Sequence, residues 1–254
     1  MRLLILALLL ATTNCLADSE SSGRNDLQPT HRLDLRYEYE NLDPQQQKYT
    51  FRLNNKFTIN QNWTSGLRVD LPVALIRKDD EGSSSETGLG KLLLQSIFIK
   101  RIEDFRWGAG LRVHTPAVSN DDLGDDKWDI APMAGMSLDL PRLGHGSFTA
   151  FMLRHRFTLS RASDEIDTNQ LEPILILNVH LKNNWFVDFR TEPILDFETD
   201  NRWSLPIGLT VGKVWQNNII FSLEPEYYII ENEEGLNFAL EARIGYFFNR
   251  IGFE

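Results

Sequence analysis

Cysteine is nearly absent from this sequence: Cys15 stands alone among 254 residues. Long apolar runs are missing too, since no stretch of about 18 apolar residues follows the N-terminus, and this excludes a helical membrane protein. Positive charge is in deficit, with 26 Lys and Arg against 36 Asp and Glu. The resulting net charge of −10 argues against a nucleic-acid partner. The length suits one large β-domain or two small domains.

The first 17 residues have the pattern of a secretory signal peptide. Arg2 supplies the positive start, residues 3–11 form an apolar core, and Ala17 is a small residue at the expected cleavage position. Cys15 leaves a lipoprotein signal open as an alternative, although residues 12–14 fit it poorly. Cleavage after Ala17 would leave a chain without cysteine, stabilised by burial and hydrogen bonding alone. We expect residues 18–28 to form a flexible periplasmic leader and residues 29–254 to form the folded domain.

The rest of the chain alternates apolar with polar side chains. Successive side chains of a strand point to opposite faces, so each such segment has one apolar face and one polar face. Apolar residues nowhere keep a spacing of 3.6, so little helix is expected. The pattern predicts twelve strands, at 32–40, 49–59, 64–77, 89–102, 106–115, 128–140, 148–160, 170–181, 185–195, 203–212, 219–229 and 237–248.

The connections between these strands alternate in length and chemistry. One set is short, and the other is mostly longer and acidic, as at 79–86 and 118–127. Outer-membrane barrels have short periplasmic turns and longer outward loops. The sequence therefore predicts an all-β fold, a single antiparallel transmembrane β-barrel of about 12 strands with short periplasmic turns and longer acidic extracellular loops.

The tryptophans supply an independent argument for a membrane barrel. Amphipathic rings favour the membrane interface, where the ring body is apolar and the N–H tip is wet. A soluble barrel capped by tryptophans is the alternative interpretation. All six lie at ends of predicted strands and are expected to form interface girdles: Trp63, Trp107, Trp128, Trp185, Trp203 and Trp215.

The polar face of the predicted strands carries charges of both signs in near balance. Unpaired charges are costly in a narrow interior, so one interpretation is a network of ion pairs that fills and braces the lumen. The other is a polar path for small solutes. Barrels of about eight strands are filled by side chains and those of sixteen or more leave open channels, so twelve strands favour a narrow or gated passage. The predicted lumen residues are Arg32, Asp34, Arg36, Glu38, Arg52, Lys56, Arg68, Asp70, Arg112, Arg154, Arg156, Glu172, Asp188, Arg190, Glu224, Glu226, Glu241 and Arg243.

Motifs for catalysis, metals or cofactors are not found. Sequences such as Gly-x-Ser-x-Gly or His-Glu-x-x-His do not occur. His155 is predicted to face lipid, and Ser160 has the opposite parity, so the two would not meet as base and nucleophile. The acidic loops follow no ordered calcium motif. We therefore expect no enzyme, no metal and no cofactor.

Several short motifs resemble those of one bacterial barrel family. They are Thr87-Gly88-Leu89-Gly90 followed by 92–95, Trp107-Gly108-Ala109-Gly110, Thr115-Pro116-Ala117, residues 123–128, 205–209, and Gly212-Lys213-Val214. In the same order, from about residue 67 to 248, they resemble the outer-membrane barrel family named for the MetA pathway of phenol degradation.

This resemblance implies an outer-membrane location and a channel or transporter for small molecules, with weakly polar or aromatic cargo. The expected partners are outer-membrane lipid and an unknown small solute, with oligomeric state left open. A structural or adhesive barrel without transport remains an alternative, and a lipid hydrolase built on a barrel is a third.

Overall fold

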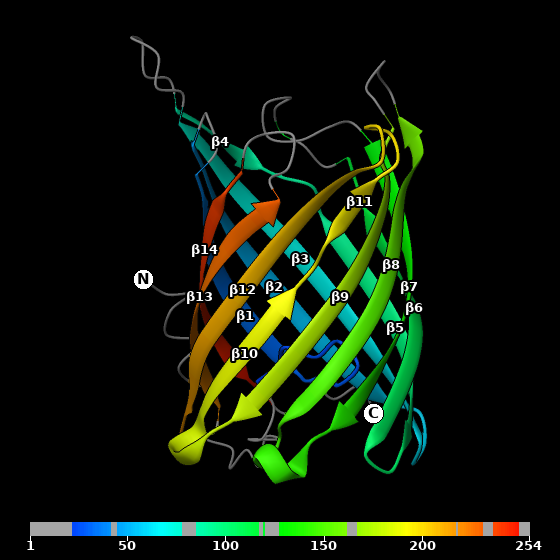
Figure 1. Ribbon diagram of the computed structural model, residues 1–254, viewed down its shortest axis with the longest axis vertical. Helices are drawn as coiled ribbons and strands as arrows, with labels where there is room; N and C mark the ends of the chain where they lie inside the picture. The colour runs from blue at the N-terminus through cyan, green and yellow to red at the C-terminus, as the bar shows by residue number, and fades with distance from the viewer. Residues whose placement is uncertain are drawn as a thin grey trace, which may run out of the picture.

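The computed structural model describes residues 22–41, 45–77, 85–116, 119, 127–161, 167–216, 218–230 and 236–248. Within these ranges the chain forms one antiparallel sheet that closes into a barrel (Figure 1). Two single turns of 3-10 helix accompany it, η2 (Pro141–Leu143) and η3 (Lys182–Asn184). The strands are β1 (Arg32–Glu40), β2 (Gln45–Thr58), β3 (Trp63–Arg77), β4 (Ser85–Leu89), β5 (Leu93–Ile102), β6 (Phe105–His114), β7 (Lys127–Asp139), β8 (Phe148–Arg161), β9 (Asn169–His180), β10 (Trp185–Thr191), β11 (Ile194–Asp196), β12 (Arg202–Trp215), β13 (Ile219–Ile230) and β14 (Phe238–Phe247).

These strands make twelve crossings, which confirms the predicted fold. β4 and β5 belong to one crossing because both pair with β3. β10 and β11 belong to another because both lie between β9 and β12. The second interruption coincides with Pro193, which has no N–H to donate to the ladder.

Pairing of β1 with β14 closes the barrel. It runs without a shift from Arg32↔Phe247 to Glu40↔Ala239. Closure leaves no unpaired edge between the first and last strands, which is what a sheet surrounded by lipid requires.

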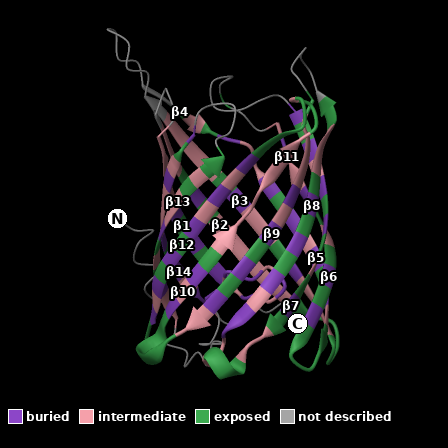
Figure 2. Cartoon of the chain, viewed as in Figure 1, coloured by how far each residue is buried: buried purple, intermediate pink, exposed green. Residues whose placement is uncertain are grey.

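Side chains alternate between the two faces of the wall as the sequence predicted. On β1, Leu33 is 51% exposed and Leu35 is 39% exposed, whereas Asp34 between them is 1% exposed. The same checkered pattern of exposed and buried residues covers the visible wall (Figure 2). The outer surface is therefore apolar and the polar side chains point inward, the reverse of a soluble protein. None of the helices in the described ranges is both long and apolar enough to span a bilayer.

The tryptophans lie on the wall at the two ends of the barrel. We call the end with η2 and η3 the short-turn end and the opposite end the long-loop end. Trp63 and Trp107 meet edge to face at the short-turn end, with ring centroids 5.7 Å apart. The Lys100 ammonium lies 5.6 Å from the Trp63 ring, an arrangement suited to an interface of apolar core and charged headgroups. Trp185 and Trp215 are also at the short-turn end, and Trp128 and Trp203 are at the long-loop end.

A β-bulge changes one prediction about faces. The β7–β8 register shifts between Trp128 and Asp129, so that Trp128 pairs with Ser160 and Asp129 pairs with Thr158. Ser160 is therefore exposed beside the outward Trp128, and its expected inward direction is wrong because the bulge breaks the two-residue period. His155 is exposed, and its Nε2 lies 2.9 Å from Asn169 Oδ1. Five residues along a strand, at about 3.3 Å each, still keep His155 out of reach of Ser160.

Candidate functional site

The inner wall of the barrel is lined with charged residues. The Arg, Asp, Glu and Lys residues named above as lumen residues are buried or half-buried on the inner wall. Many of them form ion pairs, some between neighbouring strands and some within one strand.

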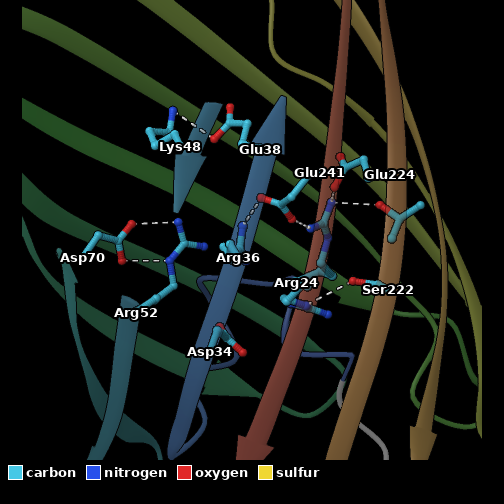
Figure 3. Close-up of polar contacts among 12 residues, drawn as sticks. Arg24, Asp34, Arg36, Glu38, Lys48, Arg52, Asp70, Ser222, Glu224 and Glu241 are labelled. Carbon is cyan, nitrogen blue, oxygen red and sulfur yellow. Dashed lines mark hydrogen bonds and ion pairs between the residues drawn. The ribbon is translucent and has the colours of Figure 1, made fainter. Parts of the chain in front are cut away.

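A group of ion pairs crosses β1, β2, β3 and β14 (Figure 3). Arg52 donates to both oxygens of Asp70, with Nε–Oδ1 and Nη2–Oδ2 each 2.7 Å. Arg68 Nε donates to the same carboxylate at 2.9 Å. Arg36 Nη1 donates to Glu241 Oε2 at 2.7 Å. Forked Arg–carboxylate bonds of this kind fix the geometry of a wall as well as its charge.

A second group of ion pairs lies on β7, β8 and β9. Arg154 bonds to Glu172 and also to Glu192 at the break between β10 and β11. Asp129 accepts from Arg156 Nη2 at 2.6 Å, and the Lys91 ammonium lies 3.2 Å away. These pairs brace the wall: removal of Arg154 would take away the guanidinium that bonds to the buried Glu172, and an uncompensated buried charge is costly.

Residues 22–30 lie inside the barrel, and we call them the lumen segment. The expectation of a flexible leader over residues 18–28 differs from the structure at 22–28, and residues 18–21 lie outside the described ranges. Asn25 builds a tight turn, since its side-chain Oδ1 accepts from Leu27 N at 2.9 Å and its carbonyl accepts from Gln28 N at 2.9 Å. Short polar side chains favour such turns.

Arg24 anchors the lumen segment to β10, β12, β13 and β14. Its guanidinium, 3% exposed, bonds to Glu224 and donates to Thr210 Oγ1 at 2.8 Å. Nη1 donates to Glu241 at 3.3 Å, and Nε lies 3.7 Å from Asp188. One guanidinium therefore serves three carboxylates from three strands, which a planar five-donor group can do and an ammonium cannot do as well.

Side chains of the barrel wall donate hydrogen bonds to the backbone of the lumen segment. Arg243 Nη2 donates to the Ser22 carbonyl at 3.0 Å, and Arg32 Nη1 donates to the Gly23 carbonyl at 2.7 Å. Gly23 has a φ of +64°, a conformation that glycine adopts without strain. Asn25 Nδ2 donates to Ser137 Oγ at 2.8 Å. The lumen segment is thus seated by bonds from several crossings of the barrel.

Leu27 covers an apolar patch on the inner wall. It is 1% exposed and belongs to one cluster with residues that include Ile97, Ile99, Met133 and Phe148. Inward apolar residues on β5, β7, β8 and β9 are unusual in a polar lumen, and Leu27 removes them from water. Burial of a leucine is worth about 1.5–3 kcal/mol.

Asp26 faces the guanidiniums of β3 and β6. Its Oδ2 lies 3.9 Å from Arg112 Nη2. Burial alone would raise the pKa of Asp26, but Arg68 and Arg112 outweigh burial and hold that pKa below its ordinary value of 3.8. The carboxylate of Asp26 is therefore charged at neutral pH.

Cavities lie on both sides of the lumen segment. The cavity at the short-turn end has a volume of about 420 Å³ and is lined by Leu27 and Pro29 together with Arg106 and Asp139. A cavity toward the long-loop end has a volume of about 390 Å³ and is lined by Arg24. The segment thus lies between two spaces within one lumen.

Neither composition nor periodicity indicated that residues 22–30 lie inside the barrel. The available signal was weak: Arg24, Asp26 and Leu27 stand in an otherwise small and polar stretch. The acidic loops considered for metal binding, at 79–86 and 118–127, lie mostly outside the described residues. Across the described ranges, three or more His, Cys, Asp or Glu side chains do not come together as metal ligands.

Comparison with known proteins shows the fold. Neither a family model nor a curated protein matches the chain, so the phenol-degradation family name rests on the motifs alone. An outer membrane channel from Pseudomonas putida F1 is similar with a TM-score of 0.71 and 14% identity, over 90% of this chain and 99% of that one. The KdgM porin is similar with a TM-score of 0.57 and 10% identity, over 86% of this chain and 99% of that one. The chain has the fold of an outer-membrane β-barrel.

Proposed function

We propose that this barrel is an outer-membrane channel for small molecules, with the lumen segment as its constriction. The observation that carries the proposal is the pair of cavities, about 420 and 390 Å³, on opposite sides of residues 22–30. A lumen braced only for stability would be filled by its side chains. Here open space remains, and a short segment without strand pairing lies between its two parts.

Three further observations support the proposal. The outer surface is apolar with aromatic residues at both ends, as lipid requires. The two similar structures named above are described as a channel and a porin. The motifs resemble a family of transporter-like barrels, which favours weakly polar or aromatic cargo. Cleavage of a signal peptide after Ala17 would leave four residues, 18–21, before the lumen segment.

Locking the lumen segment to the wall tests the channel. Asn25 Nδ2 and Ser137 Oγ are 2.8 Å apart, so cysteines at both positions can be bridged by a short bis-thiosulfonate reagent. We expect single-channel current in planar bilayers to fall when the bridge forms and to return after reduction. The single variant Asn25→Cys, treated identically, is the matched control.

Two results would overturn the proposal. A bridged protein that conducts like the unbridged one would show that the lumen segment does not restrict the path. No conductance from the folded protein, bridged or reduced, would favour a structural barrel without transport.

A further inference from the structure

The lumen charges are divided between two walls that face each other. We call Asp188, Glu224 and Glu241, on β10, β13 and β14, the acidic wall. We call Arg52, Arg68 and Arg112, on β2, β3 and β6, the basic wall. Around the barrel the two walls are separated by β1 on one side and by β7, β8 and β9 on the other. A field therefore runs across the lumen rather than along it.

Neither wall balances its charge with its own partners. On the basic wall Asp70 accepts from Arg52 and from Arg68, while Arg112 donates to the neutral Gln95 Oε1 at 2.7 and 3.0 Å. Three guanidiniums thus share one wall carboxylate. The strands of the acidic wall also carry Arg190 and Arg243, but Arg190 bonds to Glu192, and Arg243 donates to Ser222 and to the Ser22 carbonyl. Arg36 pairs with Glu241. The guanidinium that meets all three carboxylates comes from the lumen segment.

The lumen segment supplies both missing charges from three consecutive residues. Arg24 bonds to the acidic wall, and Asp26 lies 3.9 Å from Arg112 on the basic wall. Asn25 between them fixes the turn that lets the two side chains reach opposite walls. The segment therefore behaves toward the lumen as a tethered molecule with one cationic end and one anionic end.

We propose that the two walls form a binding site for a small zwitterionic solute, one that carries a guanidinium or ammonium group and a carboxylate, and that residues 24–26 occupy this site as a tethered substitute. The inference rests on the proposed channel function, because such a solute would compete with the constriction and so favour its opening. A solute with a single charge would satisfy one wall and leave the other uncompensated.

The cavity toward the long-loop end gives such a solute access to both walls. Its lining includes Glu224 and Glu241 from the acidic wall and Arg52, Arg68 and Arg112 from the basic wall. At about 390 Å³ it lies in the range of small-molecule sites. A solute entering from that end meets both walls next to Arg24 itself.

Calorimetric titration of the purified protein in detergent tests the inference. The probe is acetyl-Arg-Asn-Asp-amide, compared with acetyl-Arg-amide and acetyl-Asp-amide, which each carry one charge. With the tethered charges removed by Arg24→Gln and Asp26→Asn, we expect the probe to bind at least tenfold more tightly than to the wild type, and at least tenfold more tightly than either half. Adding Glu224→Gln and Arg112→Gln should abolish the gain.

Arg106→Gln, which changes a lumen arginine at the short-turn end, is the matched control and should leave binding unchanged. Asp26→Asn alone, at a partly exposed residue, provides a second variant if the double variant does not fold.

The outcomes separate this inference from the channel proposal. Equal binding of the probe and its halves, or no gain on removing the tethered charges, would overturn the zwitterion site even in a protein that conducts. Preferential probe binding by a protein that never conducts would support the site and overturn the channel.

Discussion

Replacing Arg24 with alanine should unseat the lumen segment while the barrel stays folded. Arg24 lies outside the sheet, and its partners Glu224, Asp188 and Glu241 belong to strands that remain paired by backbone hydrogen bonds. Loss of the guanidinium leaves these carboxylates facing a segment that no longer compensates them. They can regain water only if the segment moves away.

The expected rise in the population with a displaced lumen segment follows from how deeply the ion pairs of Arg24 are buried. The Arg24 side chain is 3% exposed, and those of Asp188 and Glu224 are 0% and 9% exposed. Removing one partner of a buried ion pair costs about 3–5 kcal/mol. At 1.4 kcal/mol per factor of ten, the displaced population should rise roughly 100- to 4,000-fold.

The reaction rate of a cysteine at position 25 with a bulky maleimide measures that population, because Asn25 is 4% exposed when the segment is seated. We expect Arg24→Ala to raise the rate by that factor in an Asn25→Cys background. Arg106→Ala, which removes a lumen arginine bonded to Asp139, should change it little. A rise of less than tenfold, with the heat-modifiable folded band intact, would refute the assignment of Arg24 as the anchor.

Four further predictions test the wall, the topology and the charges. Leu209→Arg places a charge on the outer face, where Leu209 is 48% exposed, and should destabilise the folded barrel by about 2–4 kcal/mol at mid-wall. The folded band on gels should therefore weaken, whereas Leu209→Ile should leave it unchanged. A cysteine at Asp200 should react with an impermeant thiol reagent on intact cells, and one at Gln216 only after the outer membrane is broken; the reverse pattern would invert the barrel. Arg154→Ala leaves two carboxylates without their shared partner, so reversal potentials in a salt gradient should shift toward cation selectivity; no shift would mean that Arg154 does not line the ion path. Because the pKa of Asp26 is depressed in the folded protein, its contribution to holding the lumen segment is complete above about pH 4 and is lost at lower pH. Labelling itself slows as pH falls because the thiolate is the reacting form, so the rate at position 25 is divided at each pH by the rate of an exposed cysteine at Asp200. This ratio should stay flat from pH 7 to about 5 and rise below 4, and a rise already near pH 6 would point to another group.

The wall could be predicted from sequence because lipid imposes a two-residue period. Leu33, Asp34 and Leu35 alternate in the sequence and in exposure because one face must be apolar. The same rule does not tell which side chains point outward where consecutive residues are all apolar. Ile97 and Ile99 point inward while the equally apolar Phe98 points outward at 54% exposure.

The lumen segment could not be predicted because its contacts are long-range and its own pattern is short. Arg24 reaches Thr210 and Glu241 at sequence separations of 186 and 217 residues. The nine residues of the segment, with Leu27 as their one large apolar side chain, have no periodicity from which a position could be inferred. The excess of carboxylates on the acidic wall could not be seen in the sequence, because positive and negative charges nearly balance over the whole lumen.

The two kinds of contact that hold the lumen segment determine how it can open. The barrel wall is a continuous ladder of backbone bonds closed by β1 and β14, whereas the segment is seated by side-chain bonds and by Leu27 on its apolar patch. Segments held in this way open at lower free energy than the global fold. A zwitterionic solute could replace the bonds of Arg24 and Asp26 one for one, but it would not replace Leu27, whose burial is worth about 1.5–3 kcal/mol. Opening therefore costs free energy even with the charges satisfied. A solute that also presents an apolar group to Ile97, Ile99 and Met133 would offset that cost, so among zwitterions the channel should favour those with an apolar side chain.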